Sequence, residues 1–234
     1  MTTFKQFITE DWRTTISLDE AVQLVATHCK DSLKAQRIYR GIDIDSPQSA
    51  YTLHGEIGGR KSANTSNHYT VILDHVLTPL GYPKRSASSI CSTDMYRASE
   101  YGYVYRIYPY DGVKIGVCPH EDMFYTTVHV PQNGTSAQIN RINRAFMDSY
   151  VSAESFDKLV ETCVTKQCFL FGETEEEIKK NLEKYYSPAE AGFELHTTAD
   201  FHSLPRREVW IGGKVIAVRN TYADDFDRIV RENI

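Results

Sequence analysis

The chain of 234 residues lacks any apolar run approaching the roughly 20 residues that a helix needs to cross a membrane. It also lacks CxxC pairs, and its five cysteines are odd in number, which argues against a disulfide scaffold and favours free, mostly buried thiols in a reducing compartment. Positive charges are outnumbered, because 26 Lys and Arg stand against 31 Asp and Glu. A broad nucleic-acid-binding face needs clustered cations, so the formal charge of -5 argues against one and leaves only a local basic patch open.

The N-terminal segment MTTFKQFITEDW has no basic start followed by a long apolar stretch, so no secretory signal is expected. We therefore predict a cytoplasmic protein with no membrane partner. A hydrophobic content of 41% and a charged content of 24% are ordinary for a globular chain. This length suffices for one well-filled core, and we expect a single domain over residues 1–234. The sequence leaves the oligomeric state open.

Capping residues and apolar periodicity predict the helices. Ser17 and Glu20 have the spacing of a capping box, which starts a helix over 17–36. Residues 135–185 are expected to form a mostly helical insertion, in which Thr174 and Glu177 make a second capping box. The remaining expected elements are helices at 66–80 and 93–102 and strands at 37–42, 88–92, 103–109, 113–119, 208–211 and 214–218.

Two turn signals predict β-hairpins. Asp111-Gly112 follows the strand at 103–109, and Gly212-Gly213 follows the strand at 208–211. Helices and strands succeed one another without a regular βαβ alternation. The sequence therefore predicts an α+β fold with a mixed or antiparallel sheet and flanking helices, and disfavours a parallel doubly wound sheet.

Polar residues lie where three of these strands meet loops. Arg40 ends RIYR, and Ser92 with Thr93 ends SSICS. Glu208 begins EVWI, after a long irregular stretch at 194–207 that is rich in small and polar residues. Loops of this kind often carry functional sites. We expect the three segments to converge on one cleft in the sheet.

The motifs YRG at 39–41 and STD at 92–94 followed by ASEYG, with a Glu ahead of an apolar strand, resemble the Arg–Ser–Glu class of NAD-dependent ADP-ribosyltransferases. That class includes toxin-like and tailed-phage members. The resemblance covers residues 37–118 and 192–218 and does not account for the helical region between them. It implies a split sheet, a phage origin with action in the host cytoplasm, and NAD as co-substrate. The reaction implied is transfer of ADP-ribose to a host protein or nucleic acid with release of nicotinamide.

The resemblance assigns catalytic roles to Glu208, Arg40 and Ser92. Glu208 would stabilise the oxocarbenium-like charge on the ribose, and no general acid is needed because the leaving nicotinamide is already cationic. Arg40 would hold the NAD phosphates through its guanidinium fork. Ser92, together with Thr93, would bind the ribose or orient Glu208 by a hydroxyl hydrogen bond.

Other positions acquire NAD-binding roles from the same resemblance. Gly41 would let the main chain approach nicotinamide, Tyr101 would stack on it, and Phe201 would contact NAD or the acceptor. Each has a structural alternative. Gly41 can be a turn glycine, Tyr101 a core residue and Phe201 a loop anchor, while Ser92 can be a helix N-cap and Arg40 a surface side chain.

Arg206 departs from one pattern of this class. Members that modify arginine usually carry a second Glu two residues before the catalytic one, and Arg206 occupies that position here. A guanidinium cannot act as a base and would repel a cationic acceptor. Arginine is therefore disfavoured as the acceptor, and a neutral or acidic one stays open.

Other functions compete with transfer. The same residues would suit an NAD hydrolase that uses water, or an inactive module that only binds a ligand. A cysteine hydrolase built on Cys91 is disfavoured because no nucleophile motif surrounds that residue. A metal site at His120 is disfavoured too, because its acidic neighbours would point in alternate directions and no second ligand pair follows at a regular spacing.

Overall fold

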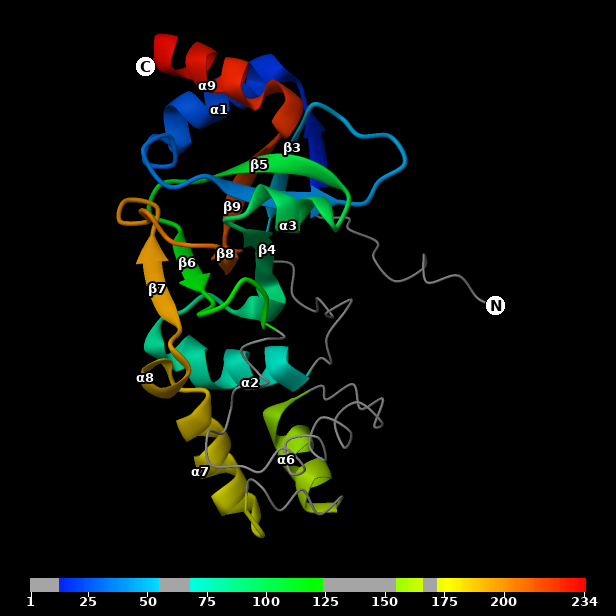
Figure 1. Cartoon of the computed structure of the whole chain (residues 1–234), viewed down its shortest axis with the longest axis vertical. Coiled ribbons are helices and arrows are strands. Elements are labelled where there is room, and N and C mark those ends of the chain that lie inside the picture. The colour runs from blue at the N-terminus through cyan, green and yellow to red at the C-terminus, as the bar shows by residue number, and fades with distance from the viewer. Residues whose placement is uncertain (1–12, 55–67, 124–154, 166–171) are drawn as a thin grey trace.

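The computed structural model describes residues 13–54, 68–123, 155–165 and 172–234. Within them a nine-stranded sheet has the order β1-β3-β9-β5-β2-β4-β8-β6-β7 (Figure 1). All its neighbouring pairs are antiparallel. The strands are β1 (Arg13–Ile16), β2 (Ile38–Ile42), β3 (Ala50–His54), β4 (Ser88–Ser92), β5 (Tyr103–Pro109), β6 (Lys114–Val117), β7 (Glu194–Thr197), β8 (Glu208–Gly212) and β9 (Lys214–Arg219).

Seven α-helices accompany the sheet in the described residues. They are α1 (Leu18–His28), α2 (His68–Leu77), α3 (Met95–Ser99), α6 (Phe156–Thr165), α7 (Glu175–Tyr185), α8 (Pro188–Ala191) and α9 (Ala223–Glu232). Short 3-10 turns lie at η2 (Thr78–Leu80), η3 (Arg85–Ala87) and η4 (Asn220–Tyr222). The predicted combination of helices with an antiparallel sheet is confirmed.

The sheet curves, so that one face becomes an internal core. Leu53 of β3, Cys91 of β4 and Val209 of β8 belong to one buried cluster, although three strands separate β3 from β4 in the sheet. We call this the inner face. Two separate groups of helices cover the outer face. Figure 1 shows α1 and α9 at one end of the molecule and α2, α6 and α7 at the other.

The two outer layers bury different halves of the sheet. Helices α1 and α9 pack on Tyr108 of β5 and on Ile216 and Val218 of β9. Helices α2, α6 and α7 pack on Trp210 of β8. Alternation along a strand sends successive side chains to opposite faces, so strands with both faces covered are apolar almost throughout.

Capping signals located helix starts more accurately than helix ends. Ser17 accepts from the Glu20 amide at 3.1 Å, as predicted, but α1 ends at His28 and the chain is not helical to residue 36. Thr174 and Glu177 form the predicted capping box of α7. Parts of the expected helical insertion, at 135–154 and 166–171, lie outside the described residues. The strands β1 and β3 and the helices α8 and α9 had not been predicted, and β7 lies in the stretch at 194–207 that was expected to be irregular.

Both predicted hairpins are wrong. β5 pairs with β2 and β9, whereas β6 pairs with β8 and β7. The turns themselves exist, since Gly112 and Gly213 have φ of 76° and 95°. At each turn the chain passes from one half of the curved sheet to the other. The two corners are adjacent, because the Tyr110 amide donates to the Lys214 carbonyl at 3.1 Å.

Candidate functional site

The three strands expected to carry the site are neighbours, in the order β2-β4-β8. Ser92 is the direct cross-strand partner of Glu208. Partners in an antiparallel pair point to the same face. Ser92 and Glu208 therefore share the outer face, at the end of β4 and the start of β8. This much of the predicted convergence is present.

Arg40 is not brought to the same face. The residue of β2 opposite Ser92 is Tyr39, so the next residue, Arg40, points the other way. Its neighbours in alternation, Ile38 and Ile42, belong to the inner core, and Arg40 is buried. The period of two along a strand thus separates the guanidinium of Arg40 from the carboxylate of Glu208. The predicted meeting of all three side chains is not found.

The carboxylate of Glu208 is held by a different arginine, Arg85. The Nη2 and Nε atoms of Arg85 donate to Oε1 at 2.9 and 3.3 Å, and the Met123 amide donates to Oε2 at 3.1 Å. The side chains of Arg85 and Glu208 are only 8% and 11% exposed. A carboxylate can accept about four hydrogen bonds, so within the described part of the chain one acceptor position remains, on Oε2.

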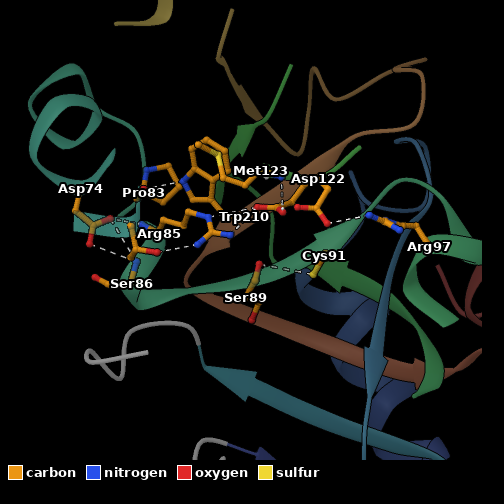
Figure 2. Close-up of polar contacts among 12 residues, drawn as sticks. Asp74, Pro83, Arg85, Ser86, Ser89, Cys91, Arg97, Asp122, Met123 and Trp210 are labelled. Atoms are coloured by element: carbon orange, nitrogen blue, oxygen red, sulfur yellow. Dashed lines mark hydrogen bonds and ion pairs between the residues drawn. The ribbon is translucent and has the colours of Figure 1, made fainter. Parts of the chain in front are cut away.

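Arg85 is itself anchored by α2. Its Nη1 donates to Thr70 Oγ1 at 2.8 Å, and its amide donates to Asp74 Oδ1 at 2.6 Å. Figure 2 shows Arg85 reaching from beside Asp74 toward Met123. Burial is the largest influence on the Arg85 guanidinium and opposes its charge, but the charge and hydrogen bonding of Glu208, together with nearby groups such as Asp74, more than offset it and raise the pKa above its ordinary value. Burial also raises the pKa of Asp74.

The hydroxyls at the end of β4 bind the loop in front of Glu208. Ser92 Oγ donates to the Arg207 carbonyl at 3.4 Å. Thr93 Oγ1 donates to the Pro205 carbonyl at 2.9 Å and accepts from the Arg207 amide at 2.8 Å. These contacts fix the main chain that enters β8.

The N-cap of α3 is Asp94, whose Oδ1 accepts from the Tyr96 amide at 3.0 Å. Ser92 therefore does not cap the helix, although its hydroxyl accepts from the Asp94 amide at 3.0 Å. Arg206 pairs with Asp94 through Nε at 3.2 Å, and its side chain is 72% exposed. The guanidinium of Arg206 thus lies at the surface beside the start of α3.

The remaining residues predicted to bind NAD are Gly41, Tyr101 and Phe201, and the packing around Gly41 and Phe201 gives each of them a structural role. A Cβ on Gly41 would lie 2.1 Å from the Ala98 carbonyl and 2.8 Å from Tyr101 Cβ, so this glycine lets α3 pack closely on β2. Tyr101 is 43% exposed beside it. Phe201 is fully buried in the inner core and meets His196 edge-on, as a loop anchor would.

Sequence reasoning missed Arg85, although it lies in the quoted segment PKRSASSICS. It is 123 positions from Glu208, and no local spacing marks the pair.

Other kinds of site find little support in the described residues. A cavity of about 410 Å³ lies at α9, away from Glu208, and is lined by Arg37, Asp224, Asp227, Arg228, Arg231 and Glu232. Cys91 is buried on the inner face, which leaves a cysteine hydrolase without an accessible nucleophile. In these ranges no His, Cys, Asp and Glu side chains gather in a group able to hold a metal, and none of the helices is long and apolar enough to span a membrane.

Comparison with protein-family models, with curated protein sequences and with solved structures finds no match to this chain. A functional proposal therefore has to rest on the residues themselves. Their main features are the Ser92–Glu208 pair across two strands and the buried arginine that holds the carboxylate.

Proposed function

We propose that this chain transfers ADP-ribose from NAD to a macromolecular acceptor and releases nicotinamide. The observation that carries the proposal is the direct pairing of Ser92 with Glu208 on neighbouring strands. It puts a hydroxyl and a carboxylate on one face, beside the strand that carries the YRG motif. We take the curved sheet, whose two halves enclose one core, as the split sheet of the Arg–Ser–Glu class that the motifs resemble.

The surroundings of Glu208 suit a carboxylate that acts on a ribose. Oε1 is occupied by Arg85, while Oε2 accepts one neutral amide and keeps one acceptor position within the described contacts. A ribose 2′-hydroxyl is a donor of the right kind for that position. The negative charge would then stabilise the oxocarbenium-like transition state that forms as nicotinamide leaves.

The acceptor we propose is a neutral or acidic group on a protein, or a nucleic acid. Arg206 lies in the loop before Glu208 and is largely exposed. Its guanidinium, which pairs with Asp94 through Nε, cannot act as a base for an arginine acceptor, and its other nitrogens can donate to a phosphate or a carboxylate.

Two observations favour a second candidate, a non-catalytic binding module on the same fold. The Glu208 carboxylate is already paired with a buried guanidinium, and Arg40 faces the opposite side of the sheet. In that case Glu208 serves only the structure, and the chain does not cleave NAD.

The test is incubation of the purified chain with cell lysate and NAD labelled in its adenylate moiety. Protein, nucleic acid and free ADP-ribose are then separated, and nicotinamide is measured. We expect a labelled macromolecule with the wild type. We expect a loss of at least about 100-fold in Glu208→Gln and a smaller loss in Ser92→Ala, because an oriented charge stabilises the transition state.

Glu176→Gln is the matched control. This glutamate lies on the exposed surface of α7, and we expect unchanged labelling. Nicotinamide release without any labelled macromolecule would replace transfer with hydrolysis. No release by the wild type would reject catalysis and leave the binding module.

A further inference from the structure

The guanidinium that touches Glu208 belongs to a residue outside the three motifs. Arg85 lies in η3, before β4, and its side chain runs along the outer face to the start of β8. Arg40, the arginine of the YRG motif, points to the inner face. On the face that Ser92 and Glu208 share, Arg85 is therefore the cation in contact with the carboxylate.

All three guanidinium nitrogens of Arg85 are engaged. Nε and Nη2 converge on Glu208 Oε1, and Nη1 binds Thr70 Oγ1. The planar fork of an arginine fixes direction as well as charge. Rotation of either side chain would break two or more of these hydrogen bonds at a site that is almost closed to solvent. The arrangement therefore sets the orientation of the carboxylate.

The second oxygen is fixed by a separate segment. Met123 donates its amide to Oε2, and the adjacent Asp122 pairs with Arg97 of α3 at 2.9 Å. The carboxylate is thus held from α2 through Arg85 and from α3 through residues 122–123. The acceptor position that the described residues leave on Oε2 has a defined direction, which is what a group acting on one ribose needs.

We propose that Arg85 is a positioning residue for Glu208, which aims the carboxylate at the ribose of NAD. The inference rests on the proposed function, since Arg85 can orient Glu208 for catalysis only if Glu208 acts on NAD. A lysine at this position keeps a positive charge but lacks the fork, so it separates orientation from charge.

The experiment compares Arg85→Lys with Arg106→Lys in the purified full chain. Arg106 is a second buried arginine, bound to Asp224 and Asp227 at 2.9 and 2.7 Å on the other half of the sheet. Nicotinamide release gives kcat and KM for NAD, and thermal unfolding gives stability. We expect kcat to fall by about 10- to 100-fold in Arg85→Lys with KM changed less than about threefold. Arg106→Lys lowers the unfolding temperature and keeps kcat.

Two further measurements protect the test against a misfolded variant. Thr70→Val removes the partner of Nη1 and leaves the Arg85–Glu208 contact in place. We expect a fall in kcat of about threefold at unchanged KM. Methylguanidinium added to Arg85→Ala should restore part of kcat, which a purely structural role would not produce.

The outcomes separate this inference from the proposed function. Folded Arg85→Lys with kcat within about twofold of the wild type, beside an inactive Glu208→Gln, overturns the inference and leaves the function standing. Equal losses of kcat in Arg85→Lys and Arg106→Lys also overturn it, because stability alone would explain them. Absence of nicotinamide release by the wild type rejects the proposed function, and the inference falls with it.

Discussion

Arg85 and Arg106 are both buried on the outer face of the sheet, yet they hold different kinds of carboxylate. Arg106 of β5 binds two carboxylates of α9, Asp224, which is 81% exposed, and Asp227, which is 14% exposed. Arg85 binds Glu208, whose side chain is almost completely enclosed. The first arginine fastens a surface helix to the sheet. The second fixes a carboxylate at a strand end.

The difference matters because a buried ion pair is weak grounds for stability. Removing two charges from water costs about as much as their attraction returns, so an enclosed pair is often replaceable by apolar residues. The Arg106 cluster avoids part of that cost by keeping Asp224 in solvent. The Arg85–Glu208 pair does not, which points to a role for Glu208 beyond packing.

The largest effect should come from breaking the enclosed pair. We expect Arg85→Met to lower the free energy of unfolding by about 3–5 kcal/mol, because it leaves the Glu208 carboxylate buried without a counter-ion. Arg85→Met with Glu208→Leu should recover most of this loss. Arg106→Met should cost less, about 1–3 kcal/mol, since Asp224 can turn fully to solvent and Asp227 keeps the hydrogen bond from the Tyr108 hydroxyl. Urea denaturation measures all three, and equal costs for the two arginines would remove the contrast drawn here.

A smaller loss in the free energy of unfolding should come from overpacking the contact between β2 and α3. Gly41→Ala puts a methyl group 2.1 Å from the Ala98 carbonyl and must displace α3 from β2. Overpacking of this kind costs about 1–3 kcal/mol. We expect the shift to lower nicotinamide release as well, because α3 begins next to Ser92. Gly116→Ala serves as a comparison for overpacking elsewhere, because its added Cβ would lie 2.1 Å from the Trp210 ring. If Gly41→Ala unfolds at the wild-type temperature, α3 does not depend on this glycine.

The smallest effect is the pH dependence of stability, whose sign should differ between Asp224 beside Arg106 and Asp74 beside Arg85. Arg106 lowers the pKa of Asp224 below its ordinary 3.8 by hydrogen bond and charge, so the stability from that contact is present above 3.8 and lost as pH falls through the folded-state pKa. Burial raises the pKa of Asp74, so its contribution is present below 3.8 and lost as pH rises through the folded-state pKa.

Unfolding temperatures of the wild type, Asp224→Asn and Asp74→Asn measure this between about pH 3 and pH 7. On acidification, the unfolding temperature of the wild type should fall relative to that of Asp224→Asn and rise relative to that of Asp74→Asn. Parallel curves for both variants would show that the two clusters do not differ in this respect.

Local features of the fold could be predicted from the sequence, whereas partners could not. The caps at Ser17 and Thr174 and the strand ends at Ser92 and Glu208 follow from neighbouring residues. Gly112 and Gly213 correctly marked turns, but a turn does not fix pairing when both faces of each strand are buried.

The face of the sheet to which Arg40 points could not be predicted from neighbouring residues either, because it depends on strand pairing. It depends on Tyr39 being opposite Ser92, and a register shift of one residue would reverse it. The contact between Arg85 and Glu208 spans 123 positions and arises only because η3 and β8 are brought together by β4 and α2. Such pairs are set by tertiary packing.

The central claim is that Ser92 and Glu208 form a working pair that cleaves NAD. Free nicotinamide, followed over time with purified wild type and Glu208→Gln, tests it most directly. We predict steady release by the wild type and a decrease of at least about 100-fold in the variant while its unfolding stays cooperative. The same rate from both proteins, or none from either, would contradict the claim.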